Sequence, residues 1–404
     1  MSNTVILKDI LAKKTIAKLN KEIVIAQVAN TEYEGELRTQ GDTVSVQTFP
    51  NVDLTYGGTA GDDITAVDWA ITAEDLEVTE VFQTNQAIKD LEAIQSNLSL
   101  QSEIAASIAY AMKLTYDRYV ARLAVEGANT SNRIVPGAAV TLNNTAADAD
   151  NIMTRLSQLA VKLKNSNAFR MPYLFINPAV EALALNSNLV TGFDKGLGYR
   201  ENGAIGKIFG MMAYTTTDLP VRYLVTMTGV AVADGTIVFT VTDNKGTAHT
   251  VTFTAKAAPS AAGEFDIATS AAAQVDIMVA MINGTGTPSA TNYIALSAAD
   301  RNYLRSVGAS AVEASTTSFY VTLASSATLD TLSAGITNGT VSAKGVVLFA
   351  CDDKSVHFVK QEDGMKVTDA PSGFRSNLLV ENVYGGKVFT ENAKRIATID
   401  VTNS

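Results

Sequence analysis

Cysteine and histidine are scarce in this chain of 404 residues, which has one cysteine and two histidines. The single cysteine, Cys351, excludes an internal disulfide framework and fits a reducing compartment. His249 and His357 lie far apart in the sequence, and neither stands in the HxxH or HExxH spacing of a metal site. Cys351, Asp352, Asp353 and His357 form the one cluster that resembles a metal site, and we interpret it as a core thiol beside a surface turn. The sequence therefore predicts no metal, no cofactor and no catalytic residues.

Long apolar runs are also missing. No stretch of about 18 apolar residues occurs, so no membrane span is expected. The first 19 residues carry four lysines and no apolar block, unlike a signal peptide. The net charge of −10 argues against tight nucleic-acid binding by the chain as a whole. The glycine-rich stretches at 57–61 and 203–210 lack the GK[ST] ending and the GxGxxG spacing of phosphate-binding loops.

Charged residues become rare between residues 222 and 342. Only 13 of these 121 residues are Asp, Glu, Lys or Arg, against 59 of the remaining 283, and Ala, Thr, Ser and Gly take their place. Such a shift in composition marks a second domain spliced into a loop of the first. We therefore predict an insertion at 222–342 in a host domain made of 1–221 and 343–404.

The charges that are present are unevenly placed. Residues 1–21 hold five lysines and one acid, whereas residues 22–88 hold thirteen acids and one arginine. A basic arm followed by an acidic segment favours contact between the two across a subunit boundary, although two solvated surfaces that never meet would give the same pattern. The residues predicted to make this inter-subunit contact are Lys13, Lys14, Lys18, Asp62, Asp63 and Trp69.

Apolar spacing predicts the elements of the host domain. Alternation predicts strands at 22–28 and 43–49 and returning strands at 69–72 and 76–82, so that 35–80 forms a long two-stranded excursion with a glycine-rich tip. Three- and four-residue steps predict a helix over 86–126 with Asn85 as its N-cap, roughly 60 Å long and suited to a spine. Further predictions are a helix at 148–164, a strand at 173–177, a short helix from Pro178, a strand region at 205–217, paired strands at 345–350 and 356–360, and a β-rich segment at 377–401.

The predicted insertion reads as a small α+β module. Residues 236–242 and 250–255 alternate about the turn 243–246, which indicates a hairpin. Helices are predicted at 271–282 and 298–305, and a further strand at 319–323.

Three stretches of the host domain carry a further signal: 41–50, 205–220 and 383–389 with 393–399. Together they resemble the major capsid protein of tailed phages, the Hong Kong-97 type fold. Residues 41–50 (GDTVSVQTFP) resemble the first strand of that family's extended loop. Residues 205–220, which begin IGKIFG and end DLP, resemble its approach to a surface loop. Residues 383–389 (VYGGKVF) with 393–399 resemble its closing strand. The three stretches span the host domain in the family's order.

The resemblance implies an α+β fold with five parts. They are an N-terminal arm (1–33), an extended loop lying on a neighbouring subunit (34–82), a peripheral domain with the spine helix (83–134 and 376–404), an axial domain (135–221 and 343–375), and the small inserted α+β domain (222–342). Some family members link an extended-loop lysine to a neighbour's asparagine. No lysine lies between Lys21 and Lys89 here, so we expect a shell held together without covalent bonds.

The resemblance also implies a function. The chain is expected to be no enzyme but a major capsid protein that self-assembles into pentamers and hexamers, forming an icosahedral shell around packaged phage DNA. Its expected partners are further copies of itself, non-specific packaged DNA, a portal and a separate scaffolding protein, with a decoration protein as a further candidate. Its expected location is the virion, and the host cytoplasm during assembly. Two alternatives stay open: an encapsulin-like compartment of the same fold, and a tail-tube or surface adhesion protein, which the Thr/Ala-rich insertion favours.

Overall fold

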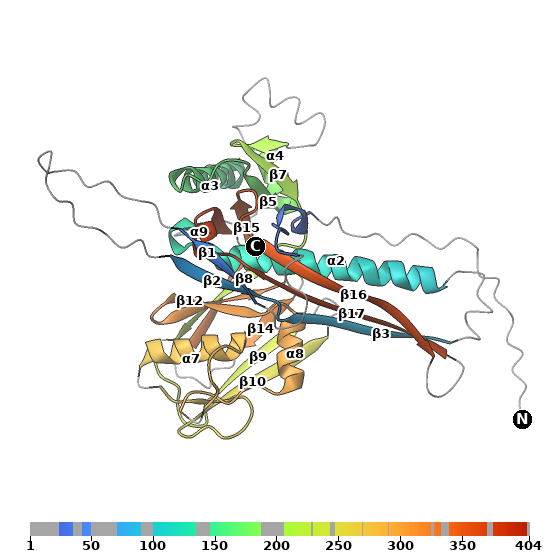
Figure 1. Cartoon of the computed structure of the whole chain (residues 1–404). Helices are drawn as coiled ribbons and strands as arrows, with labels where there is room; N and C mark the ends of the chain where they lie inside the picture. Colours follow the sequence, from blue (N-terminus) through green and yellow to red (C-terminus); the bar gives the residue numbers. More distant parts are fainter. Residues whose placement is uncertain are drawn as a thin grey trace, which may run out of the picture. The chain divides into compact units, whose positions relative to one another are not determined.

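The computed structural model (Figure 1) describes residues 24–34, 43–49, 71–89, 100–134, 146–186, 206–227, 229–242, 247–268, 270–289, 291–324, 327–332, 339–369 and 375–401. The chain divides into two compact units. The first unit contains residues 1–18, 30–110 and 357–389, and the second contains 19–29, 111–356 and 390–404. The chain combines helices with mostly antiparallel sheets, which confirms the α+β class. Among the described residues, no helix is both long and apolar enough to cross a membrane.

The first unit holds a two-stranded and a three-stranded sheet. Strands β1 (Thr43–Thr48) and β2 (Thr72–Glu77) pair antiparallel, from Thr43 opposite Glu77 to Thr48 opposite Thr72, which confirms the predicted two-stranded excursion at its base. Its tip, 50–70, lies outside the described residues. Three long strands lie side by side in Figure 1 in the order β16-β17-β3, all antiparallel: β16 (His357–Asp369), β17 (Arg375–Lys387) and β3 (Glu80–Lys89).

The predicted start of the spine helix is wrong. Residues 86–89 belong to strand β3, and Asn85 pairs with Leu379 instead of capping a helix. The described helix α2 runs over Leu100–Gly127. Apolar steps of three and four residues across 86–99 suit a helix, but pairing with a distant strand overrides local pattern in 86–89. The predicted returning strand 76–82 also divides, because β2 ends at Glu77 and β3 begins at Glu80 in a different sheet.

A nine-stranded sheet organises the second unit. Its main path is β12-β13-β8-β15-β5-β7-β6, and β18 pairs with β15 while β4 pairs with β18. The strands are β4 (Arg133–Ile134), β5 (Tyr173–Ile176), β6 (Lys207–Ile208), β7 (Met211–Thr215), β8 (Val221–Met227), β12 (Ser310–Ser315), β13 (Ser318–Leu323), β15 (Gly339–Cys351) and β18 (Ile396–Val401). The predicted strand region 205–217 is the β6–β7 hairpin, and its turn places Gly210 at φ 89°, a conformation that glycine tolerates best.

Helices α3 (Ala146–Asn165) and α4 (Pro178–Asn186) match their predicted places. Helix α3 packs against α4, β15 and β18. The Asn177 side chain accepts a hydrogen bond from the Val180 N–H (2.8 Å), so asparagine and proline together start α4. Short helices complete the host elements: η1 (Ala26–Val28), η2 (Thr130–Asn132) and α9 (Thr390–Ala393).

The predicted hairpin, helices and strand within 222–342 are confirmed. Strands β9 (Thr236–Thr242) and β10 (Ala248–Lys256) pair antiparallel at the centre of a four-stranded sheet, which β14 (Thr328–Leu332) and β11 (Glu264–Asp266) complete. Helix α7 (Ala271–Asn283) begins at the N-cap Ser270, and α8 (Ala298–Ser306) begins at the N-cap Ser297. One apolar core joins this sheet and its helices to β8, β12 and β13 of the larger sheet.

The domain boundaries stay predictions. The four-stranded sheet, α7 and α8 lie wholly inside 222–342, whereas β8 and β15 cross its two ends and β12–β13 extend the nine-stranded sheet from within it. A cut at 222 and 342 would therefore pass through two paired strands of the larger sheet.

Two further local predictions are wrong. In the predicted strand 22–28, the described residues 24–28 do not form a strand, because the Asp117 carboxylate accepts the N–H groups of Ile25 and Ala26 and stabilises the turn η1 instead. Residues 345–350 and 356–360 are not paired with each other. Residues 349–351 of β15 already pair with both β18 and β5, and β16 pairs with β17.

Candidate functional site

The residues predicted from charge pattern to contact a neighbouring subunit, Lys13, Lys14, Lys18, Asp62, Asp63 and Trp69, lie outside the described residues. The structure does describe the base of the excursion that carries three of them. The candidate site is therefore this base, from which the excursion starts.

An apolar cluster holds the base of the excursion, and we call it the hairpin root. It consists of Leu76, Val78, Val359, Val383 and Phe389, and the side chains of Tyr33, Val44 and Val46 pack against it. Leu76 is the one buried residue of β2, and it is fully buried. Each fully buried side chain of this size stabilises the packed state by about 1.5–3 kcal/mol. The root is thus strong enough to fix the β1–β2 hairpin on the three-stranded sheet.

Gly385 lies on β17 where the end of β2 crosses it. A Cβ atom on Gly385 would lie 2.2 Å from the Glu77 carbonyl oxygen and 2.8 Å from the Val78 Cα. Both neighbours are backbone atoms, so no side-chain rotation could relieve the overlap. The glycine of the VYGGKVF stretch is therefore needed for a close approach of two backbone segments.

Polar contacts at the same crossing orient the end of β2. The Lys387 ammonium donates to the Asp75 carbonyl oxygen (2.9 Å) and lies 3.8 Å from the Glu74 carboxylate. Lys387 and Glu74 are both partly exposed, so the ion pair itself contributes roughly 0–1 kcal/mol. We infer that these polar contacts orient the hairpin, whereas the apolar hairpin root holds it in place.

His357 is part of this packing. It is buried, with its ring centroid 4.6 Å from that of Phe389 and 5.5 Å from that of Tyr33. Its Nδ1 lies 3.3 Å from the Asn30 side-chain nitrogen, and the Phe358 N–H donates to the Asn30 carbonyl oxygen (2.9 Å). Among the residues that the structure describes, no group of three or more His, Cys, Asp or Glu could hold a metal ion.

A buried charged network surrounds the C-terminal end of α2 in the second unit. The Arg222 guanidinium pairs with the Asp400 carboxylate (2.9 Å), donates to the Val125 carbonyl oxygen (3.3 Å) and lies over the Tyr320 ring. Arg133 donates to the Glu126 carbonyl oxygen (2.7 Å). Arginines from two strands thus satisfy carbonyl groups at the end of a helix that has no basic residue in its own last turn.

Burial changes the ionisation of this network. Desolvation raises the pKa of the Glu126 carboxyl, while Arg122 and a hydrogen bond from the Ser310 hydroxyl act in the opposite direction. Desolvation lowers the pKa of Arg133. Desolvation thus outweighs the attraction between these charges, and it is the ion pair and hydrogen bonds of the network that link the end of α2 to strands β4, β8 and β18.

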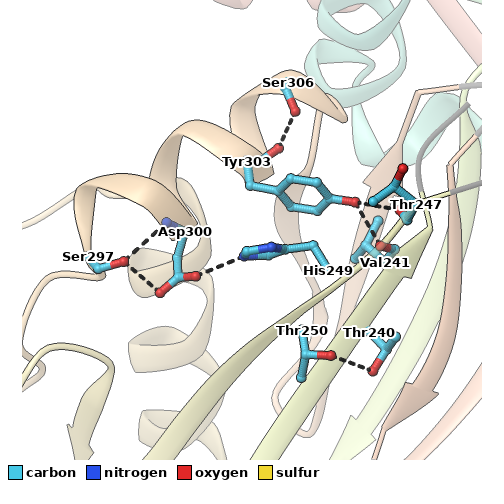
Figure 2. Close-up of polar contacts among 9 residues, drawn as sticks. All are labelled: Thr240, Val241, Thr247, His249, Thr250, Ser297, Asp300, Tyr303 and Ser306. Carbon is cyan, nitrogen blue, oxygen red and sulfur yellow. Dashed lines mark hydrogen bonds and ion pairs between the residues drawn. The ribbon is translucent and has the colours of Figure 1, made fainter. Parts of the chain in front are cut away.

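A third polar cluster, drawn in Figure 2, lies within the predicted insertion 222–342. His249 on β10 contacts Asp300 (3.0 Å), and the Ser297 hydroxyl donates to the other oxygen of the same carboxylate (2.7 Å). The His249 ring lies 4.2 Å from that of Tyr303, whose hydroxyl donates to the Val241 carbonyl oxygen (2.8 Å). Ser297 is bonded to the aspartate and not to the histidine, so the serine–histidine contact of a nucleophilic triad is not formed here. The cluster ties α8 to the β9–β10 hairpin.

Sequence reasoning missed the roles of Gly385, Arg222 and Asp117. Gly385 was part of a recognised stretch, but its partner is backbone far earlier in the chain. The acid that Arg222 pairs with is 178 residues away. No signal within the local sequence could have joined these groups.

Comparison with known proteins places the fold. No family model matches the chain, and no curated protein matches it in sequence. In structure the chain is similar to one from Mycobacterium phage Che8, with a TM-score of 0.57, 14% identity, and all of both chains covered. It is also similar to a chain in the capsid of the cyanophage P-SCSP1u, with a TM-score of 0.54, 14% identity, and 99% of this chain and 94% of the other covered. The chain thus has the Hong Kong-97 type fold, which confirms the fold that the sequence resemblance implied.

Proposed function

We propose that this chain is the major capsid protein of a tailed phage and self-assembles into pentamers and hexamers that close an icosahedral shell around packaged DNA. The observation that supports the proposal most directly is the similarity over almost the full length of both chains to a chain of a phage capsid. Nothing in these comparisons favours a compartment for protein cargo or a tail tube, so we pursue neither.

The described geometry supports a structural role for the extended loop. The hairpin root and Gly385 hold the base of the β1–β2 hairpin rigidly on the sheet, while β1 and β2 lead away from it. A stiff base with a long projection suits a segment that must reach a neighbouring copy at a fixed angle. We propose that residues 34–82 act in this way.

We also propose where the chain acts and with which partners. The chain would work in the virion and pass through the host cytoplasm during assembly. Its partners would be further copies of itself, a portal, a separate scaffolding protein, a candidate decoration protein, and DNA bound without sequence preference.

Electron microscopy of the purified chain tests the proposal. With or without a co-expressed scaffolding protein, we expect closed shells or rings of five and six subunits. Stacked tubes, or monomers alone under every condition, would contradict it.

We expect the basic arm to contribute salt-sensitive contacts to assembly. Residues 1–21 carry an excess of positive charge and 22–88 an excess of negative charge. Each exposed pair contributes roughly 0–1 kcal/mol, but a shell repeats it at every interface. Changing Lys13, Lys14 and Lys18 together to Glu should lower the yield of shells, measured by sedimentation at low ionic strength where screening is weakest. The same triple change to Arg, which keeps the charge, should leave the yield near the original; equal yields for both variants would argue against the contact.

We also expect no covalent bond between subunits. The predicted extended loop has no lysine to form an isopeptide bond. The one cysteine, Cys351, is buried, and burial raises the pKa of its thiol to about 12, so little reactive thiolate forms. Mature shells boiled in denaturing detergent, with or without reductant, should give one band near the chain mass of 42.6 kDa. A ladder of higher bands would show a cross-link.

A further inference from the structure

Asp117 is a buried carboxyl on α2 that holds a segment far earlier in the chain. Its side chain is fully buried. Its Oδ1 accepts hydrogen bonds from the N–H groups of Ile25 (2.7 Å) and Ala26 (2.8 Å). These donors lie at the start of η1, whose own N-cap residue, Ile25, makes no side-chain hydrogen bond. The helix therefore caps a turn that the local sequence leaves uncapped.

The segment that Asp117 holds, residues 24–29, carries no charged side chain. Residues 24–29 (VIAQVA) are all neutral, and Val24 and Ile25 are buried. Among the described residues, the second carboxyl oxygen of Asp117, Oδ2, is buried and has no hydrogen-bond partner. An ionised oxygen in that position carries a desolvation cost that a neutral hydroxyl largely avoids.

Two charged residues act on Asp117 from its surroundings. The nearby Asp218 carboxylate disfavours a second negative charge, while Arg118, next to Asp117 on α2, favours it. Arg118, however, is also hydrogen-bonded to Asp218 (2.9 and 3.1 Å), which shares its positive charge. Burial is the largest effect and outweighs both backbone hydrogen bonds, so the pKa of Asp117 is raised to about 6.

We propose that Asp117 makes the docking of residues 24–29 onto α2 depend on pH, tight when the carboxyl is protonated and looser when it is ionised. A neutral carboxyl keeps its carbonyl oxygen, which can still accept both N–H groups, and the proton is taken up from solvent onto the buried Oδ2. The inference concerns the folded chain and holds whether or not it forms a shell.

The direction follows from linkage between docking and proton binding. When the segment is undocked and Asp117 is in water, its pKa returns toward the ordinary value of 3.8, whereas in the docked state it is about 6. The docked state therefore binds the proton more tightly, so docking strengthens as pH falls through about 6 and reaches its weakest level above pH 7.

Hydrogen exchange of the Ile25 and Ala26 amides reports on this docking, because they are the donors to Asp117. After correction for the intrinsic effect of pH, we expect protection about tenfold greater at pH 5 than at pH 7.5, with the increase beginning near pH 6. In Asp117→Asn, which keeps the accepting oxygen and cannot ionise, protection should not change over this range. Asp276→Asn, at an exposed aspartate of α7, is the control and should respond to pH as the unmodified chain does.

Constant protection from pH 5 to pH 7.5 in the unmodified chain would overturn the proposal. A pH response in Asp117→Asn as large as that of the unmodified chain would overturn it too, by assigning the effect to another group. Should Asp117→Asn fail to fold, the pH dependence of protection in the unmodified chain decides alone, through its presence and the pH at which it begins.

Discussion

Replacing Gly385 with alanine should reduce the yield of closed shells at least tenfold. The added Cβ would lie 2.2 Å from the Glu77 carbonyl oxygen, so either β17 or the end of β2 must move. Overpacking of this kind costs about 1–3 kcal/mol where side chains can adjust, and more where backbone is struck. Because Glu77 and Val78 lead directly from the hairpin into β3, the shift would change the direction in which the hairpin leaves the sheet. Sedimentation of particles and monomers measures the effect.

A second glycine supplies the control for this prediction. A Cβ atom on Gly286, in the predicted insertion, would meet no heavy atom within 4 Å, although the φ of 83° at this residue makes any side chain strained. Gly286→Ala should therefore cost about 1 kcal/mol of folding free energy and leave the shell yield close to that of the unmodified chain. If Gly385→Ala gives shells at the unmodified yield, the close approach at β17 does not direct the hairpin.

Local pattern was sufficient for many elements of this fold. Alternation predicted β9 and β10 because Ile237, Phe239 and Val241 are buried in a core while Val238 and Thr240 between them are only partly buried. Helices α3, α4, α7 and α8 have amphipathic spacing or clear caps within their own sequence. Such elements are specified by residues only a few positions apart, which a single sequence displays directly.

Elements fixed by distant partners were predicted poorly. Residues 86–89 have helical spacing yet form strand β3, because Arg375 to Leu378 supply a matching edge almost 290 positions later. The turn η1 depends on Asp117, which is 91 residues beyond Ala26. The candidate site follows the same rule: the tip residues were chosen from charge, which is local, whereas the hairpin root and Gly385 depend on which segments cross in space.

The end of α2 shows how the chain stabilises such long-range crossings with charge. Arg222 reaches three groups from different parts of the second unit: the Asp400 carboxylate, the Val125 carbonyl oxygen and the Tyr320 ring. Only 3% of the side-chain surface of either Arg222 or Asp400 is exposed, so solvent cannot replace the pair if it is broken. An intact buried ion pair of this kind stabilises the fold little more than an apolar contact would. Removing one partner is costly, because the other charge then stays buried without the partner that offset its desolvation.

Arg222→Met should therefore lower the free energy of unfolding by about 3–5 kcal/mol, since it leaves the Asp400 charge without the arginine that pairs with it. Chemical denaturation of the unassembled chain, monitored by a signal that reports unfolding of the second unit, measures this loss. The double change Arg222→Met with Asp400→Leu removes both charges and should recover most of it, because similar apolar volumes replace a buried pair at little cost.

An exposed pair provides the matched control for the arginine. Lys394 and Glu391 are 2.9 Å apart with 50% and 59% of their side-chain surfaces exposed, so Lys394→Met should change stability by less than about 1 kcal/mol. If Arg222→Met costs no more than this control, the network at the end of α2 does not fasten the helix. If the double variant is no better than the single one, the loss comes from the Val125 and Tyr320 contacts and not from the broken pair between Arg222 and Asp400.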